Sequence, residues 1–149
     1  MDATYQVIEV DRVSGELAAV LGALVRQLST SSPEPTQEDL QAIASSPATR
    51  LLVAQDAEGR PVGMLTLAVF AIPTGVRAWI EDVVVDEQVR GGGVGRMLVQ
   101  RGIDVAFEFG ARTVDLTSRP SREAANRLYQ RMGFALRTTN VYRFTAPAD

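Results

Sequence analysis

Apolar and polar positions alternate with two different periods along the first third of the chain. Tyr5 to Val10 alternates sufficiently between apolar and polar residues to predict a first, half-buried strand. After Ser14, apolar residues between Leu17 and Leu28 recur at helical spacing and predict an amphipathic helix. Ser29 to Pro35 is rich in serine and proline and predicts a loop.

The middle of the chain changes from helical to strand spacing. Thr36 to Ser45 predicts a short helix with a threonine N-cap and acidic residues in its first turn. Strands are predicted at Leu51 to Ala54, Val62 to Ala71 and Ala78 to Val85. Because the turns between these strands are short, we expect an antiparallel meander.

The last third of the chain alternates helices with strands. Val94 to Phe109 predicts a third helix that Gly110 ends, and Thr113 to Thr117 predicts a strand. Arg122 to Met132 predicts a fourth helix capped by Gly133, and Phe134 to Phe144 predicts two more strands. The element order is then β α α β β β α β α β β.

This order predicts an α+β domain. A mostly antiparallel, mixed sheet of about seven strands would be flanked by about four helices, with one parallel crossover between Ala78 and Thr117. No repeat, low-complexity segment or shift in composition divides the chain, so residues 1–149 are expected to form a single domain.

Two residue types that often carry chemistry are absent from the sequence. The chain has no cysteine and no histidine, which excludes disulfides, thiolate metal sites and a cysteine nucleophile. No metal site is expected, and proton transfer is left to carboxylates, tyrosines or water. All 15 cationic side chains are arginines, so a phosphate loop that ends in Gly-Lys-Ser/Thr is excluded as well.

The net charge, the first residues and the lengths of the apolar runs limit the partners and the location that we expect. A net charge of −3 argues against nucleic-acid binding and suits a cationic small molecule or a peptide amine. The first residues lack the basic and apolar regions of a signal peptide, and no apolar run is long enough to span a membrane. A soluble, cytoplasmic protein without membrane contact is therefore expected.

A glycine-rich turn lies between the strand that ends at Val85 and the third helix. Its residues are Arg90, Gly91, Gly92, Gly93, Val94, Gly95 and Arg96. Glycine permits positive φ and close approach to a ligand, and the free amides of the following helix attract anions, so the turn suits a diphosphate. A turn that only reverses the chain is the alternative. A dinucleotide fold is disfavoured, although Asp115 stands near the required distance, because Leu98 replaces the third glycine.

The turn and a second motif together resemble the GNAT superfamily of acyl-CoA N-acyltransferases. The family signature, Arg/Gln-x-x-Gly-x-Gly/Ala, stands here as Arg90 to Gly95, after the strand from Ile80 to Asp86. The helix with Tyr129 and the Met132-Gly133-Phe134 sequence is similar to a later family helix that ends in Gly-Phe. The two motifs cover about residues 79 to 134, and the element order matches the family fold.

The resemblance implies a binding mode for acetyl-CoA as the cosubstrate. The main chain around Val83, Val84 and Val85 would pair with the pantetheine arm, and the amides of Gly91 to Arg96 would hold the diphosphate. Tyr129 would lie near the thioester sulfur. Many members have an asparagine seven residues before this tyrosine, whereas here that position is Arg122 and Asn126 lies three residues before it.

An acetyl transfer to an amine needs a proton acceptor and a proton donor. Glu81 and Asp82, just before the glycine turn, are the candidate bases, with Glu81 favoured, and an ion pair with arginine is the alternative role for each. Tyr129 is the candidate acid towards the thiolate, or else a half-buried packing residue. Without cysteine or histidine, direct attack of a primary amine in a ternary complex is expected.

Two further expectations concern the class of function and the assembly. An acyl-CoA binding or sensing module without catalysis remains the alternative to an acetyltransferase, and Arg122 is the residue that favours it. Exposed sheet edges commonly pair between subunits, so a homodimer is compatible with the sequence.

Overall fold

The computed structural model describes residues 4–148 as a five-stranded sheet with four α-helices. The described chain divides after Thr117 into two compact units. The sheet, its order β1-β2-β3-β4-β5, and the first three helices belong to the first unit. The strands are β1 (Gln6–Val10), β2 (Thr49–Gln55), β3 (Pro61–Ile72), β4 (Gly75–Val85) and β5 (Val114–Asp115).

The meander and the crossover agree with the sequence analysis. β1 to β4 pair antiparallel in chain order, and β5 pairs parallel with β4. The connection between β4 and β5 runs through a short 3-10 helix, η1 (Glu87–Val89), and through α3 (Val94–Glu108). A parallel pair requires such a crossover because both strands run in the same direction.

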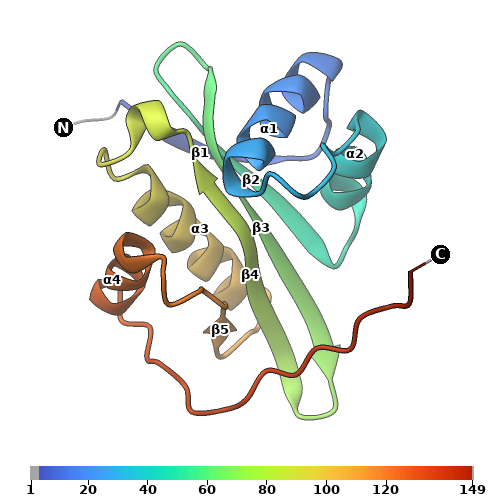
Figure 1. The fold of residues 1–149 in the computed structure, drawn as a ribbon, viewed down its shortest axis with the longest axis vertical. Helices are drawn as coiled ribbons and strands as arrows, with labels where there is room; N and C mark the ends of the chain where they lie inside the picture. The colour runs from blue at the N-terminus through green and yellow to red at the C-terminus, as the bar shows by residue number, and fades with distance from the viewer. Residues whose placement is uncertain (1–3, 149) are drawn as a thin grey trace. The chain divides into compact units, whose positions relative to one another are not determined.

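Helices cover both faces of the sheet in the first unit (Figure 1). α1 (Gly15–Leu28) and α2 (Gln37–Ser45) lie on one face and α3 on the other. Leu51 to Ala54 in β2 is apolar at four successive positions because both faces of the strand are buried. Leu51 and Val53 belong to the core under α1 and α2.

The opposite face is packed closely against α3. A Cβ at Gly102 would lie 3.4 Å from the Leu65 side chain and 3.5 Å from that of Ile80, in ordinary van der Waals contact, so the helix lies directly on the sheet here. A Cβ at Gly63 would lie 3.0 Å from Leu98. The missing side chain at Gly63 leaves room for Leu98, so the first turns of α3 pack directly on β3, close to the end of β4 and the glycine-rich turn.

Both N-terminal helices begin as the sequence predicts. Ser14 accepts a hydrogen bond from the Leu17 amide at 3.1 Å, and Thr36 accepts one from the Asp39 amide at 3.0 Å. The Asp39 carboxylate accepts one in return from the Thr36 amide, and this backbone hydrogen bond, with the threonine side chain, lowers the pKa of Asp39.

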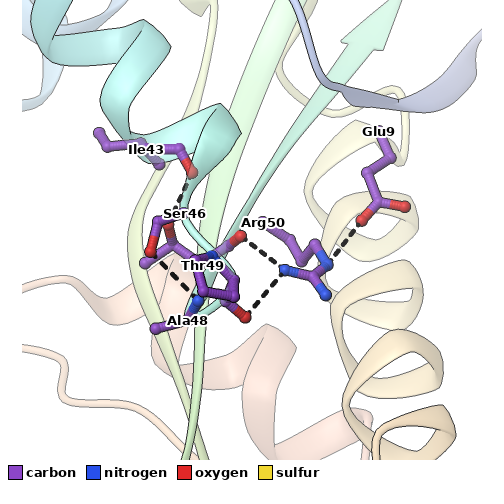
Figure 2. A network of polar contacts seen from close by, with 7 residues as sticks. Glu9, Ile43, Ser46, Ala48, Thr49 and Arg50 are labelled. Atoms are coloured by element: carbon purple, nitrogen blue, oxygen red, sulfur yellow. Dashed lines mark hydrogen bonds and ion pairs between the residues drawn. The ribbon is translucent and has the colours of Figure 1, made fainter.

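Polar contacts fix the connection from α2 to β2 (Figure 2). Arg50 lies 3.1 Å from the Glu9 carboxylate on β1 and donates to the carbonyls of Pro47 and Thr49. Its guanidinium also lies 4.3 Å from the centre of the Phe109 ring, just beyond α3. Arg50 therefore links four segments of the first unit.

The second unit contains α4 (Glu123–Arg131) and an extended C-terminal segment. Gly133 has a φ of 103°, and the Phe134 amide donates to the Tyr129 carbonyl, so the helix ends as predicted. The two further strands predicted between Phe134 and Phe144 are wrong, as is the total of seven. No residue after Gly133 in the described chain joins a ladder, because alternation supplies an apolar face but not the partner that a strand needs.

Candidate functional site

The candidate site in the first unit is centred on the end of β4. β4 ends at Val85, Asp86 is the N-cap residue of η1, and the glycine-rich turn leads from Arg90 into α3. The core under α1 and α2 holds one side of β4 through Val84, and the glycine contacts above hold the start of α3. The turn is thus held at both ends by buried elements.

The glycine-rich turn has the backbone geometry that its sequence predicts. Gly91 and Gly93 have φ angles of 88° and 85°, which side-chain-bearing residues rarely adopt. A Cβ added at either position would meet no atom within 4 Å. Gly91, Gly92 and Gly93 are all exposed. Gly91 and Gly93 therefore create an open backbone surface rather than a close packing contact.

The start of α3 presents free backbone donors at this surface. The first helical hydrogen bond that reaches back to the turn runs from the Met97 amide to the Gly93 carbonyl, at 3.1 Å. Within residues 4–148, the amides of Val94, Gly95 and Arg96 donate to no backbone acceptor. Unpaired amides at a helix N-terminus attract anions, and the exposed side chains of Arg90 and Arg96 add positive charge.

β4 has a free edge beside the turn. β5 pairs only with Ala78 and Trp79, so no strand of the described chain pairs with this side of β4 from Ile80 onward. The Asp86 amide donates to Val62 on β3 at 2.8 Å. Since alternate residues direct their amides to opposite sides, Val85 directs its amide to the free edge, and Val83 lies two residues earlier on the same strand. The Val85 carbonyl accepts a hydrogen bond from Arg90 Nε at 3.2 Å.

A bulge in β4 separates the two candidate bases. Thr66 on β3 lies opposite Glu81, and Met64 lies opposite Val84, so Asp82 and Val83 together face one residue. Asp82 has a φ of 50°, the only positive value of a described non-glycine residue. The bulge places Glu81 on the same sheet face as Val84, towards α1, and both carboxylates are exposed.

Tyr129 lies in the second unit and is buried. Its ring meets that of Phe134 edge to face, with 5.8 Å between the centroids. Burial raises the pKa of Tyr129, and the positive charge of Arg122 opposes this rise. The phenol is therefore protonated at neutral pH and is able to donate a proton.

The other candidates of the second unit surround the start of α4. Arg122 is the exposed N-cap residue of the helix, without a capping side-chain hydrogen bond. Asn126 donates from Nδ2 to the Arg119 carbonyl at 2.9 Å, so its amide stabilises the preceding loop. The Ser118 hydroxyl is the one buried side-chain polar atom of the described chain that lacks a hydrogen-bond partner.

The sequence analysis missed the residues that support the turn. Asp86 is buried and accepts a hydrogen bond from the Gln88 amide, as an N-cap residue does. An aspartate directly after a strand is a signal for this cap, but its partner Gln27 on α1 carries no sequence signal. The Tyr5 ring lies 3.5 Å from the position that a Gly92 Cβ would take, beside the turn.

Residues 4–148 contain neither a cluster of metal ligands nor a helix that could span a membrane. No group of three or more carboxylate, histidine or cysteine side chains is arranged to hold a metal ion. No helix in this part of the chain combines the length and the apolar character needed to cross a membrane.

Comparison with known families and sequences gives one consistent result. The family described as "Acetyltransferase (GNAT) family" matches residues 17–134. The curated "Uncharacterized N-acetyltransferase YhbS" of Escherichia coli K12 is 34% identical over 87 residues, which are 57% of this chain and 48% of that protein. The chain thus matches about half the length of this relative.

Solved structures extend the likeness over nearly the whole chain. A putative acetyltransferase from Agrobacterium tumefaciens superposes with a TM-score of 0.81 and 26% identity, over 94% of this chain and 99% of the other. An aminoglycoside acetyltransferase, meta-AAC0020, from an uncultured soil metagenomic sample has a TM-score of 0.85 at 19% identity, over 99% of both chains. The second likeness establishes the fold alone.

Proposed function

Because the chain belongs to the GNAT acetyltransferase family, we propose that it moves an acetyl group from acetyl-CoA to a primary amine in a ternary complex. The observation that carries this proposal is the set of unpaired amides at Val94, Gly95 and Arg96, next to open, positive-φ glycines. A diphosphate is the part of acetyl-CoA that such a surface fits.

The free edge of β4 supports a position for the pantetheine arm. The arm is rich in amides, and a sheet edge binds an extended amide chain as it would bind another strand. Val83 and Val85 would bind the arm, and the thioester would then lie along β4. An edge amide in this stretch would stabilise the oxyanion of the tetrahedral intermediate.

In the proposed reaction, the lone pair of the amine attacks the thioester carbonyl carbon. A new C–N bond forms, the C–S bond breaks, and CoA leaves as a thiolate. Glu81 takes the proton that the amine loses, directly or through a water molecule, and Tyr129 donates a proton to the sulfur. Glu81 is preferred over Asp82 because the strained backbone at the bulge gives Asp82 a structural role.

The remaining assignments are also proposals. Arg122 would contact a phosphate group of CoA, and Asn126 would support that contact through the Arg119 loop. The acceptor is proposed to be a small-molecule or peptide amine, in line with the aminoglycoside named for meta-AAC0020. One domain, a cytoplasmic location, the absence of nucleic-acid partners and a homodimer stay predictions.

The test is thiol release from acetyl-CoA across a panel of amines that includes aminoglycosides, polyamines, amino acids and peptide N-termini. We expect amine-dependent release of free CoA with at least one class, together with an acetylated product of matching mass. Tight CoA binding by folded protein without amine-dependent release from any class would favour the sensing module. Absence of CoA binding would contradict both functions.

A further inference from the structure

A polar cluster centred on the buried Asp86 carboxylate connects the residues just before the glycine-rich turn to α1. Asp86 is 8% exposed, and its Oδ1 accepts hydrogen bonds from the Gln88 amide at 3.1 Å and from Gln27 Nε2 at 3.4 Å. Its Oδ2 lies 3.6 Å from the Arg60 guanidinium, in the turn between β2 and β3. The carboxylate thus receives donors from three separate segments.

Gln27 uses both ends of its side-chain amide in this cluster. While Nε2 donates to Asp86, Oε1 accepts a hydrogen bond from the Glu87 amide at 3.0 Å. The glutamine therefore contacts two successive residues of the connection between β4 and the turn. Residues 27 and 86 are 59 positions apart, so this contact depends on the tertiary fold.

The position of the cluster determines what it can influence. η1 spans only Glu87–Val89, and the Gly92 amide donates back to the Val89 carbonyl at 3.3 Å. A shift of η1 would therefore move the turn and the first amides of α3 with it. Gln27 and Arg60 are both exposed, but Gln27 makes two hydrogen bonds to this connection, whereas Arg60 contributes one ion pair at 3.6 Å that water screens. Gln27 is therefore the stronger anchor.

We propose that Gln27 is a positioning residue that holds η1 and the glycine-rich turn in the geometry that binds the CoA diphosphate. The inference rests on the proposed function and adds α1 to the elements that build the cosubstrate site. A glutamine suits this role because one amide group offers a donor to the carboxylate and an acceptor to the backbone. Asp86 acts through the same contact.

The test compares three substitutions in the full chain by titration with CoA. Gln27→Met removes both hydrogen bonds while keeping the length of the side chain. Gln27→Glu keeps an acceptor for the Glu87 amide but turns a carboxylate oxygen towards Asp86. Gln100→Met is the matched control, because Gln100 on α3 donates to Asp104 at 3.0 Å and the pair is exposed.

We expect Gln27→Met to raise the dissociation constant for CoA by roughly tenfold, because the buried Asp86 carboxylate loses one hydrogen-bond donor and the Glu87 amide loses its acceptor. Gln27→Glu should weaken binding further, because two carboxylates repel. The KM for acetyl-CoA should rise in step while kcat stays near the wild-type value. Hydrogen exchange of the amides in the turn should also become faster, whereas Gln100→Met changes none of these.

The outcomes separate this inference from the proposed function. If wild-type protein does not bind CoA, the proposed function fails. If the wild type binds CoA and Gln27→Met binds it equally well with unchanged exchange in the turn, the positioning role is wrong. A Gln27→Glu protein that binds at least as well as Gln27→Met would also overturn the pairing with Asp86. Thermal melts of all variants identify any that do not fold, and Arg60→Met is then the second probe of the cluster, with a smaller loss expected.

Discussion

At the scale of single residues, the adjacent carboxylates Glu81 and Asp82 have different backbone environments. Glu81 lies in regular register opposite Thr66, whereas Asp82 forms the bulge with a φ of 50°. The sequence places both in the predicted strand from Ala78 to Val85, and neither residue type indicates the bulge. The candidate acids were therefore found from the sequence, but their relative placement was not.

This difference predicts unequal effects of two isosteric substitutions. Glu81→Gln should lower kcat by roughly a hundredfold, since loss of a general base typically costs about that much. Asp82→Asn keeps a side chain that tolerates positive φ and should leave kcat within a few fold. Steady-state kinetics with saturating acetyl-CoA measure both. Equal losses in the two variants would contradict the assignment of the base to Glu81.

Tyr129 is predicted to act on the leaving thiolate. Tyr129→Phe should lower kcat by roughly a hundredfold and leave the affinity for CoA near the wild-type value. The ring and its contact with Phe134 are retained, so a role in packing predicts little change. Full turnover in the folded variant would assign Tyr129 to packing alone.

The raised pKa of Tyr129 also predicts a pH dependence of stability. The folded phenol keeps its proton to a higher pH than the unfolded one, whose pKa is about 10. This contribution to the free energy of unfolding is present below pH 10 and is lost as the pH rises through the folded value. Above pH 10, the free energy of unfolding measured with urea should therefore fall more steeply with rising pH for the wild type than for Tyr129→Phe. If the free energy of unfolding depends on pH equally in both proteins, burial does not raise the pKa of the phenol.

At the scale of elements, local signals in the sequence predict the helices and the pairing in the meander well. Ser14, Thr36 and Gly133 begin or end helices where the sequence places them. The C-terminal strands fail because a strand depends on a partner that alternation cannot reveal. β5 likewise has only two residues instead of the five expected from Thr113 to Thr117.

The capping box of α2 should contribute measurably to the free energy of unfolding of the protein. Thr36→Ala removes the acceptor for the Asp39 amide and should lower the free energy of unfolding by about 1 kcal/mol. Ser31→Ala is the control, because its exposed hydroxyl contacts only the Ser29 hydroxyl. Urea unfolding at neutral pH measures the difference, and equal stability of the two variants would show that the cap contributes nothing.

At the scale of the whole molecule, the most exposed large apolar side chains of the described residues all lie after Gly133 in the sequence. Leu136, Tyr142 and Phe144 are 92%, 88% and 98% exposed. Such side chains are common where a surface meets a partner, which makes this segment the place to test the predicted homodimer. Sedimentation equilibrium should show a dimer that Tyr142→Ser and Phe144→Ser together weaken. A wild-type protein that is monomeric at high concentration would rule the dimer out.

The central claim is that the glycine-rich turn holds the diphosphate of CoA, and two glycines at opposite ends of α3 test it. Gly93 and Gly110 have φ angles of 85° and 92°, and an added Cβ meets at most one atom, Val76 Cγ2 at 4.0 Å from Gly110. Valine at either position should therefore strain the backbone to a similar degree. Gly95→Glu, which places a negative charge at the turn, is the second variant if Gly93→Val does not fold.

The decisive measurement is calorimetric titration of CoA into the wild type, Gly93→Val and Gly110→Val, each shown to be folded. We predict a loss of at least about tenfold in affinity for Gly93→Val, or about 1.4 kcal/mol, and wild-type affinity for Gly110→Val. Equal CoA affinity in the wild type and the Gly93→Val protein would contradict the account.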